Sequence, residues 1–397
     1  MRLDTVFVRW TWCRAVLHRG WWLVTSVYLV LDAHLPAAQL VLVGVAQGIV
    51  ALVFEVPAGV VADTLSRKWS LVVSHVLMGA AMIATALVSG FGPIVATQLV
   101  WGLSWTFASG ADVAWITDEL AEPARTAGVL LRAGRAQLIG AVAGLVGIGG
   151  LAWLTHRGTA MVLAGAAMLL LGLYVVVAFP ERRFVPAPVR RWSTSWSILV
   201  RGFALVRGSR VLLVLLAAAF LVNGVAGTAG RLYAVRLLDI GLTADPVVWL
   251  TVLGVLALLG GAAAARLVQP RVDGAVTVRR GYLVTCGVAA VGVAGLAVAP
   301  EAGSGSVAVV LAAGALPLAR TFGTIWVNRQ TGGDVRATVH SLLAQAEYLG
   351  AITCGLAIAA VAHGGHLPLA LVTCAALLAI AAVLVQRLGF PRRAPVR

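Results

Sequence analysis

Six ionisable side chains lie inside long apolar runs of this sequence, where a charge needs a specific reason to be present. An ionisable group at the centre of a bilayer costs about 2.5–3.5 kcal/mol on insertion scales. The possible reasons are proton exchange, ion pairing, or the lining of a path through a membrane. The six side chains are Asp32, Glu55, Asp112, Arg231, Arg320 and Glu347.

Asp112 has the sequence context best suited to proton exchange. It precedes Asp118 by six residues, which places it about 9 Å deeper along a helix. Burial disfavours the charged form of a carboxylate, so a group at this depth could bind and release a proton near neutrality. The alternative is a structural carboxylate that is paired with a basic neighbour or that supports the packing of small residues.

Arg320 and Glu347 fall at similar depths in consecutive apolar runs. Arg320 lies nine residues before Arg329, and Glu347 lies eleven residues after Arg336, so the helical rise puts both near the middle of a membrane. A buried arginine and a buried glutamate on neighbouring helices most simply neutralise each other. We therefore expect an Arg320–Glu347 pair, which is either structural or part of the path of a substrate.

Twelve long apolar runs must position these side chains. Hydrophobic residues make up 60% of the chain, charged residues 11%, and the mean hydropathy is +0.96, which excludes a water-soluble fold. A spanning helix needs about 20 apolar residues, and the runs are too long and continuous for the alternating strands of a membrane barrel. We predict an all-α integral membrane protein with twelve transmembrane helices, at about 14–33, 39–62, 69–90, 93–119, 133–154, 159–179, 211–235, 246–266, 278–299, 305–327, 336–362 and 367–387.

The basic residues are concentrated at alternate ends of these runs, which accounts for the net charge of +15 without a nucleic-acid partner. The opposite ends carry Arg157 and Arg236 and little else that is basic. This positive-inside asymmetry predicts that both termini and the region 182–210 are cytoplasmic. The residues at the basic ends are Arg2, Arg9, Arg67, Lys68, Arg125, Arg182, Arg183, Arg190, Arg191, Arg271, Arg279, Arg280, Arg329, Arg336, Arg392 and Arg393.

The longest polar interruption, 181–210, divides the predicted helices six and six. We expect an N-terminal half over 1–180, a cytoplasmic linker over 181–210 and a C-terminal half over 211–397. Within the linker, tryptophans interleave with arginines, as in a basic amphipathic helix that lies on a membrane surface. The alternative is a simple tether.

The two halves resemble each other weakly. Residues 114–128 can be aligned with 325–339, and after a shift of one residue Gly140 falls opposite Gly350. Such a match is what two pseudo-symmetric six-helix halves predict. Glycine-rich rows of this kind also permit close packing of helices within a membrane.

The segment 55–68, EVPAGVVADTLSRK, is the most specific motif in the chain. It places Gly59, Asp63, Arg67 and Lys68 in a charged turn between two apolar runs. This turn resembles the loop signature G-x-x-x-D-R-x-G-R-K of the major facilitator superfamily of secondary transporters, although Thr64 and Ser66 replace an Arg and a Gly of that pattern. The resemblance implies two six-helix halves that work by alternating access, with a site near the midplane between the repeats.

The resemblance also gives the loop a mechanical role at the cytoplasmic side. Gly59 would allow a close approach of helices, and Asp63 would face the N-terminus of the eleventh helix, where the helix dipole favours an anion. Arg67 would reach Asp118 or Glu119 at the inner end of the fourth helix. Arg329, the repeat-equivalent of Asp118, would compete for the same carboxylates. We expect these contacts to hold the halves together and to break as the protein opens inward.

A second gating contact is expected at the outer face. Asp32 and Arg231 lie in equivalent helices, the first and the seventh, which meet at the outer face in the family that this chain resembles. We expect an Asp32–Arg231 latch; the alternative is two interfacial residues in water. Glu55 precedes Pro57, which is expected to bend the second helix, and it is either structural or part of the substrate path.

The strings FEVPAG and SGADVAW look most like bacterial drug or small-molecule exporters, which favours proton-driven export of an amphipathic compound. Two features weaken this interpretation. Gln98 stands where many exporters carry an arginine four residues before a glycine, and the fifth helix has no proline after its glycines. Uptake or uniport of a metabolite is the alternative within the same fold. A scaffold or sensor without transport is disfavoured by the buried charges.

No enzyme chemistry is indicated by the sequence. It contains no Walker loop, no nucleophile–base arrangement and no cluster of metal ligands, and the four cysteines have no paired spacing. We expect no cofactor and no metal. The expected partners are a small-molecule substrate, a coupling proton and the lipid bilayer, with a monomer in the cytoplasmic membrane of a bacterium as the working form.

Overall fold

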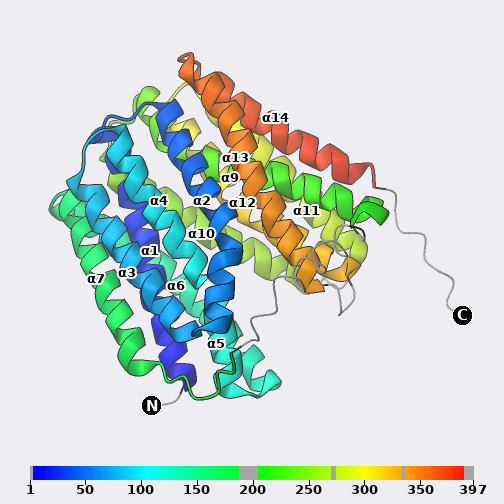
Figure 1. Ribbon diagram of the computed structural model, residues 1–397. Coiled ribbons are helices and arrows are strands. Elements are labelled where there is room, and N and C mark those ends of the chain that lie inside the picture. The colour runs from blue at the N-terminus through cyan, green and yellow to red at the C-terminus, as the bar shows by residue number, and fades with distance from the viewer. Residues whose placement is uncertain (1–2, 187–203, 205, 270–273, 332–335, 389–397) are drawn as a thin grey trace, which may run out of the picture. The chain divides into compact units, whose positions relative to one another are not determined.

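The computed structural model is built of helices (Figure 1). It describes residues 3–186, 204, 206–269, 274–331 and 336–388, and no strand occurs among them. The N-terminal helices are α1 (Leu3–Leu31), α2 (Ala37–Thr64), α3 (Arg67–Leu87), α4 (Phe91–Ala108), α5 (Ala111–Leu120), α6 (Pro123–Leu154) and α7 (Arg157–Ala178). The C-terminal helices are α9 (Arg210–Asp239), α10 (Pro246–Val268), α11 (Ala275–Val298), α12 (Ala302–Gln330), α13 (Arg336–His363) and α14 (Leu367–Gln386). The predicted all-α membrane fold is confirmed.

The chain divides into two compact units. The first contains Met1–Trp192 and Leu242–Val255, and the second contains Ser193–Gly241 and Leu256–Arg397. The helix α10 is therefore divided: it groups with the first unit up to Val255 and with the second unit from Leu256. The amphipathic helix predicted in the linker falls mainly on 187–203, outside the described residues, and the predicted domain boundaries stay a prediction.

Among the described residues, ten helices are long and apolar enough to cross a membrane. The other two predicted spans correspond to α1 and to α4 with α5. Arg14, His18 and Arg19 make α1 more polar than its neighbours. The predicted span 93–119 is interrupted: α4 ends at Ala108 and α5 begins at Ala111, because Gly110 adopts the left-handed conformation (φ +74°).

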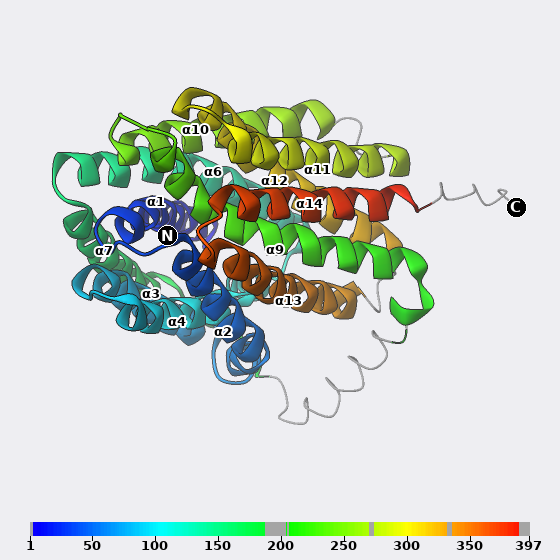
Figure 2. The same ribbon diagram turned by 90° about the horizontal axis from the view of Figure 1, so that it is seen from above.

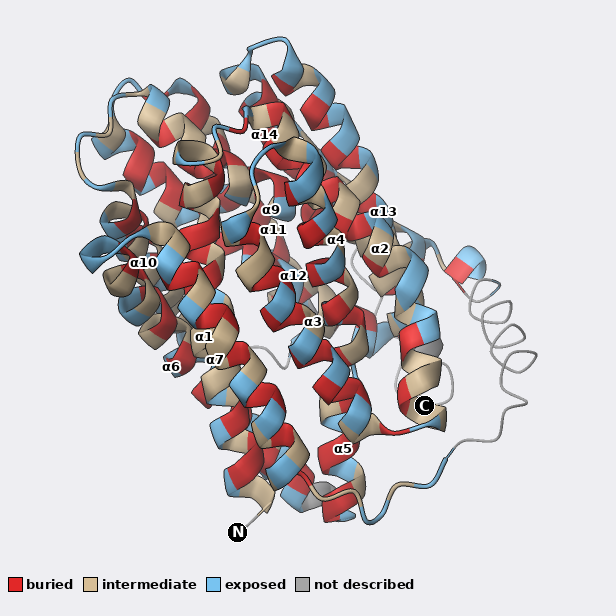
Figure 3. Cartoon of the chain, turned by 60° about the vertical axis from the view of Figure 1, so that its left-hand side comes forward, coloured by how far each residue is buried: buried red, intermediate tan, exposed pale blue. Residues whose placement is uncertain are grey.

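The helices present apolar side chains outwards. Leu154, Leu170 and Val177 are 74%, 66% and 80% exposed, and in Figure 3 exposed and buried residues alternate around the same helices. Exposed apolar surface on this scale is unfavourable in water. It is the expected outer surface of a bundle that is surrounded by lipid.

The two units repeat one order of helix neighbours. In the first unit the contacts run α6, α1, α7, α3, α4, and in the second they run α13, α9, α14, α11, α12. Figure 2 shows α7, α3 and α4 side by side in the first unit, and α9, α14 and α11 side by side in the second. This shared order is the internal duplication that the weak sequence match indicated.

Glycines fix the closest contact in each unit. A Cβ built on Gly144 of α6 would overlap the carbonyl of Val16 in α1, and one on Gly20 would overlap the carbonyl of Gly144. In the second unit Gly350 meets Phe220 in the same way. Gly224, four residues after Phe220, meets Gly350 just as Gly20 meets Gly144. The packing therefore pairs Gly350 with Gly144, one helical turn from the Gly140 that the sequence alignment chose.

Candidate functional site

An aromatic and cationic row runs along one face of α1. Trp10, Arg14 and His18 are spaced four residues apart, so their side chains share a face of the helix. The guanidinium carbon of Arg14 lies 5.3 Å from the ring centre of Trp10 and 5.2 Å from that of Trp105 in α4. These distances are within the range of cation–π attraction, so the two indoles hold the charge of Arg14 inside the bundle.

The break between α4 and α5 brings Asp112 to this row. Gly110 ends the turn, α5 starts at Ala111, and Asp112 lies in its first turn. Oδ2 of Asp112 is 3.5 Å from Nη1 of Arg14, and Oδ1 accepts a hydrogen bond of 2.8 Å from the backbone N–H of Val113. The side chains of Arg14 and Asp112 are 15% and 24% exposed. Of the two alternatives from the sequence, the structure thus gives Asp112 a basic neighbour, and its role in proton exchange stays a prediction.

A cavity of about 320 Å³ opens beside this ion pair. His18 closes one side, with its ring 5.4 Å from the rings of both Trp101 and Trp105. Nε2 of His18 is buried and has no hydrogen-bond partner within the described part of the chain. The residues that line the cavity come from α1, α4, α5 and α6 and from the turn between α4 and α5: Trp10, Thr11, Arg14, Ala15, His18, Trp105, Ala108, Ser109, Gly110, Asp112 and Gln137.

Sequence reasoning missed Arg14 and His18. It started the first span at residue 14 and so treated the arginines there as flanking charges. The structure begins α1 at Leu3, with Val6, Phe7 and Trp10 buried, which moves Arg14 well inside the helix. The available signal was the four-residue spacing of Trp10, Arg14 and His18.

Glu55 of α2 contacts the break between α4 and α5. Its Oε1 accepts a hydrogen bond of 2.7 Å from the hydroxyl of Ser109, the residue that follows α4. Glu55 therefore supports the turn that carries Gly110 and Asp112. Whether it also lines a substrate path stays a prediction.

The loop signature forms a polar cluster at one end of the first unit. Arg67 pairs with Asp118, as the sequence predicted, and it also donates to the carbonyl of Ala114 (2.8 Å) and lies 3.6 Å from Asp63. These contacts tie the start of α3 to α5 and to the end of α2. The gating role proposed for this cluster stays a prediction.

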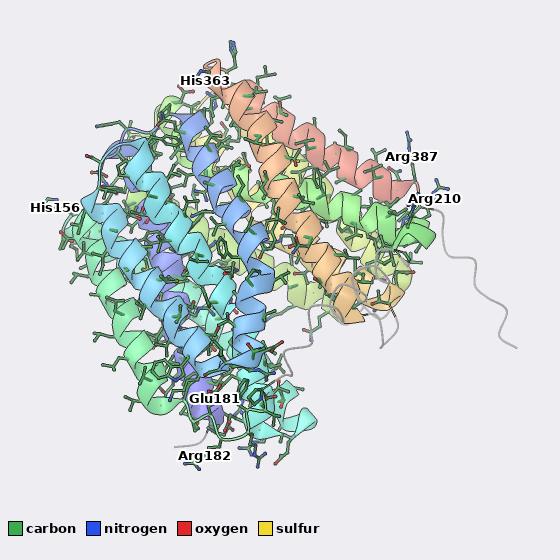
Figure 4. All side chains as sticks on the ribbon, in the orientation of Figure 1. His156, Glu181, Arg182, Arg210, His363 and Arg387 are labelled. Carbon is green, nitrogen blue, oxygen red and sulfur yellow. The ribbon has the colours of Figure 1, made fainter. Side chains whose placement is uncertain are left out.

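The chain that follows α7 folds back onto this cluster. Glu181 accepts hydrogen bonds from the Ser66 hydroxyl (2.5 Å) and from the backbone N–H of Lys68 (3.0 Å). Glu119 accepts from the backbone N–H groups of Arg182 and Arg183 (2.8 and 2.9 Å). Figure 4 labels Glu181 and Arg182 at the end of the unit opposite His156. Sequence reasoning did not single out Glu181, because a carboxylate at the start of a polar segment resembles any solvated charge.

Gly59 of the loop signature lies in α2. A Cβ built on it meets no atom of the described residues within 4 Å. Gly59 is therefore not at a close contact among the described residues, and its role in the approach of helices during gating stays a prediction. Close contacts of the first unit are made by other glycines, among them Gly20, Gly144 and the pair Gly79 and Gly165.

In the second unit Arg320 and Glu347 form the pair that the sequence predicted. Nη2 of Arg320 is 3.6 Å from Oε2 of Glu347, with side chains 49% and 25% exposed, and Asn223 of α9 lines the same gap as this pair. The gap beside the pair holds about 10 Å³, roughly the space of a single water. Tyr282 and Leu343 are among the residues that line it.

The two residues of the expected outer latch lie in different units. Asp32 is engaged within its own unit, where Arg157 at the start of α7 donates two hydrogen bonds to it, of 2.6 and 3.1 Å. Arg231 lies in the second half of α9 and is partly buried. The Asp32–Arg231 latch stays a prediction, as do the contacts expected of Asp63 and of Arg329, the latter exposed at the end of α12.

Gln98 belongs to a closed polar network. It accepts a hydrogen bond from the side chain of Gln47 (2.7 Å) and donates one to Thr85 (2.9 Å), which in turn contacts Thr97. All four side chains are buried. Gln98 therefore bonds within the packing between α2, α3 and α4, and its carbonyl and amide groups each have a partner there.

No group of three or more histidines, cysteines or acidic residues in the described residues is arranged to hold a metal ion. In unit two, Figure 4 labels His363 at the end opposite Arg210 and Arg387. His363 ends α13 and His366 precedes α14, so the two histidines flank a turn.

Comparison with known proteins gives a consistent picture. Residues 13–353 match the family described as the Major Facilitator Superfamily. No curated protein matches the sequence. A mutant of the nucleoside transporter NupG is similar in structure, with a TM-score of 0.82, 13% identity, and coverage of 97% of this chain and 99% of that one.

Two further solved structures share the fold. One is a bacterial homologue of the human lysosomal transporter Spinster, with a TM-score of 0.71 and 16% identity over 97% of both chains. The other is the POT family transporter PepTSo, with a TM-score of 0.76 and 11% identity over 96% of both chains. At these identities the likeness establishes the fold alone.

Proposed function

This chain belongs to the major facilitator superfamily, and from that premise we propose that it couples movement of a small amphipathic molecule to movement of protons. As a member, it is a multi-pass membrane protein and a secondary transporter that works by alternating access, not an enzyme. We place it in the cytoplasmic membrane of a bacterium, as a monomer with both termini in the cytoplasm. The positive-inside distribution of arginines supports that orientation.

The observation that carries the proposal is the Arg14–Asp112 pair beside a cavity of about 320 Å³. A cavity of this size is at the lower end of small-molecule sites, which combine apolar and aromatic walls with a few polar groups. The cavity supplies both: indole faces from Trp10 and Trp105, and the charges of Arg14 and Asp112. An ionisable pair within a spanning bundle is by default a functional candidate.

The proposed proton coupling uses the same pair. A proton on Asp112 removes the negative charge that holds Arg14, and the guanidinium is then free for another partner. Loss of the proton restores the pair. In this proposal Asp112 alternates between a protonated state, in which Arg14 is available to a substrate, and an ionised state, in which Arg14 is paired. A transporter needs such a difference between its loaded and unloaded forms.

The cluster at Arg67 and Asp118 is proposed as the inner gate. Its contacts bind α3, α5 and the chain after α7 into one rigid end of the first unit. Asp63 and Arg329 would then make the contacts between the halves, and Asp32 with Arg231 would make them at the outer side. Arg320 and Glu347 would line the route in the C-terminal half.

We favour export because the FEVPAG and SGADVAW strings look most like bacterial exporters. Uptake of a metabolite is the second candidate, and two observations favour it. Gln98, at the position of the exporters' arginine, forms its hydrogen bonds with Gln47 and Thr85 inside the first unit. The solved structures that share the fold include the nucleoside transporter NupG.

The test is the drug susceptibility of a pump-deficient bacterial host that expresses the wild type or Asp112→Asn, at matched membrane levels, across a panel of amphipathic compounds. Raised tolerance to particular compounds that Asp112→Asn abolishes would support export. Unchanged tolerance to every compound, with the protein well inserted, would contradict export. Accumulation of labelled metabolites by the same cells would then test uptake.

A further inference from the structure

The Arg14 guanidinium is an under-used hydrogen-bond donor. It carries five N–H groups, yet it forms no hydrogen bond with any residue that the structure describes, and its one ion pair, with Asp112, is 3.5 Å long. Its neighbours Trp10 and Trp105 offer ring faces, which attract the charge without accepting its N–H groups in the plane of the guanidinium. Because the Arg14 side chain lines the cavity, its unused N–H groups are available to a ligand that binds there.

A second source of positive potential faces the same cavity. The N-terminus of α5 begins at Ala111, directly after the cavity-lining Gly110, and the N-cap glycine has no side chain to bond the first N–H groups. The first turn of a helix leaves such groups without partners inside the helix, and its dipole favours an anion there. Half-helices that begin inside a membrane bundle can bind anionic groups of substrates in this way.

The carboxylate of Asp112 marks where that anion would lie. One of its oxygens accepts from Val113 in the first turn of α5, and the other faces Arg14. Asp112 thus holds the position that joins the helix N-terminus to the guanidinium. A carboxylate is the group that an arginine fork binds best, through two parallel hydrogen bonds, and the present 3.5 Å contact does not use that geometry.

The remaining walls define the rest of the ligand. Trp105 is 38% exposed. The indole rings of Trp105 and Trp10 and the imidazole ring of His18 form planar walls of the cavity. Flat rings pack against such walls in offset or edge-on arrangements. Nε2 of His18 adds one unused polar atom at the edge of the cavity.

We propose that the cavity of the first unit binds an organic anion with a flat aromatic body, its carboxylate taking the place of Asp112 at Arg14 and at the N-terminus of α5. The proposal rests on the proposed function, since it treats this cavity as the transport site. It adds the chemical class of the substrate. It also makes the Asp112 carboxylate a competitor of the substrate for Arg14.

The test uses three probes of one shape and different charge: 1-naphthoate, the neutral 1-naphthamide and the cationic 1-naphthylmethylamine. Binding of each to the purified full-length protein in detergent is measured by isothermal titration calorimetry. We expect naphthoate to bind about tenfold or more tightly than the other two, the factor that one charge-assisted hydrogen bond can supply. Equal binding of the three probes, or a preference for the amine, would overturn the proposal.

Two variants and a control assign the preference to residues. Arg14→Gln is expected to remove the preference for naphthoate, and Asp112→Asn to strengthen naphthoate binding several-fold, because the competing carboxylate is gone. Arg9→Gln is the matched control, an arginine of the same helix that does not line this cavity. A preference that survives Arg14→Gln, in protein that elutes as a single folded species, would overturn the proposal.

The susceptibility panel separates failure of this inference from failure of the proposed function. Export of cationic or neutral compounds through an Asp112-dependent route, with no binding of naphthoate, would leave the function standing and refute the substrate class. Binding of naphthoate without any transport would support the anion site and contradict the proposed function.

Discussion

The two halves of this protein share a packing scheme and differ in what that packing encloses. In the first unit the contact of α1 with α6 at Gly20 and Gly144 has its counterpart in the contact of α9 with α13 at Gly224 and Gly350. Beside the first contact lie a cavity of about 320 Å³ and the Arg14–Asp112 pair. Beside the second lie a gap of about 10 Å³ and the Arg320–Glu347 pair.

The cores show the same difference. The fully buried tryptophans of the described residues belong to the first unit, whereas large fully buried side chains of the second unit include Leu212, Leu232 and Ile358. These tryptophans are Trp10, Trp21 and Trp115. The two units thus share their close backbone contacts, and in the first unit Trp10, Arg14 and His18 of α1 line a cavity together with residues of α4, α5 and α6.

The shared packing can be tested by one equivalent substitution in each half. Gly144→Val and Gly350→Val each place a branched side chain against a backbone carbonyl, and we expect each to destabilise the protein by about 3 kcal/mol or more, at the upper end of overpacking effects. Thermal unfolding of purified protein measures the loss. Gly147→Val and Gly227→Val are the controls, because a Cβ at either position meets no described atom within 4 Å. Equal stability of Gly144→Val and Gly147→Val would refute the packing scheme.

A feature of the first unit alone is the return of the chain after α7. Glu181→Gln weakens two hydrogen bonds to the start of α3, one of them to a backbone N–H. Hydrogen bonds to charged groups contribute about 1.5–3 kcal/mol when buried, and this site is only partly buried, so we expect a loss of about 1–2 kcal/mol in thermal unfolding. Arg182→Gln serves as the control, since Arg182 joins the cluster through its backbone N–H. If the control loses as much stability as Glu181→Gln, the carboxylate has no special role.

The smallest effect is expected at the Asp32–Arg157 pair, at the end of the first unit away from Arg67 and Glu181. The Asp32–Arg157 pair is 36% and 25% exposed, and partly exposed pairs contribute about 0.5–1 kcal/mol. Two double variants with exchanged charges test which arginine pairs with Asp32 during transport. They are Asp32→Arg with Arg157→Asp, and Asp32→Arg with Arg231→Asp. We expect the first double variant to recover the stability that Asp32→Arg loses. Recovery of transport by the second double variant alone would assign the working contact to the latch.

The sequence predicted the helical membrane fold from its long apolar runs and the Arg320–Glu347 contact from paired charges at similar depths. The contact of Arg67 with Asp118, one of two carboxylates left open, came from the resemblance of the loop to a family signature. The sequence did not predict the break at Gly110, since one glycine within an apolar run does not distinguish a turn from a helix. It also missed Arg14, because an arginine near the start of an apolar run reads as a flanking charge until the indoles of Trp10 and Trp105 are known to surround it. The partners of Glu181 come from segments far apart in the chain, and no local pattern encodes them.

The central claim is that the Arg14–Asp112 pair of the first unit couples transport, whereas the Arg320–Glu347 pair of the second unit only lines the route. The direct test measures compound tolerance and metabolite accumulation in one host that expresses Asp112→Asn or Glu347→Gln at matched membrane levels. We predict that Asp112→Asn reduces the transport phenotype about tenfold or more, whereas Glu347→Gln changes it by less than about threefold, since its partner Arg320 is 49% exposed and such a pair contributes at most about 1 kcal/mol. Loss of transport in Glu347→Gln with transport retained in Asp112→Asn would contradict the account.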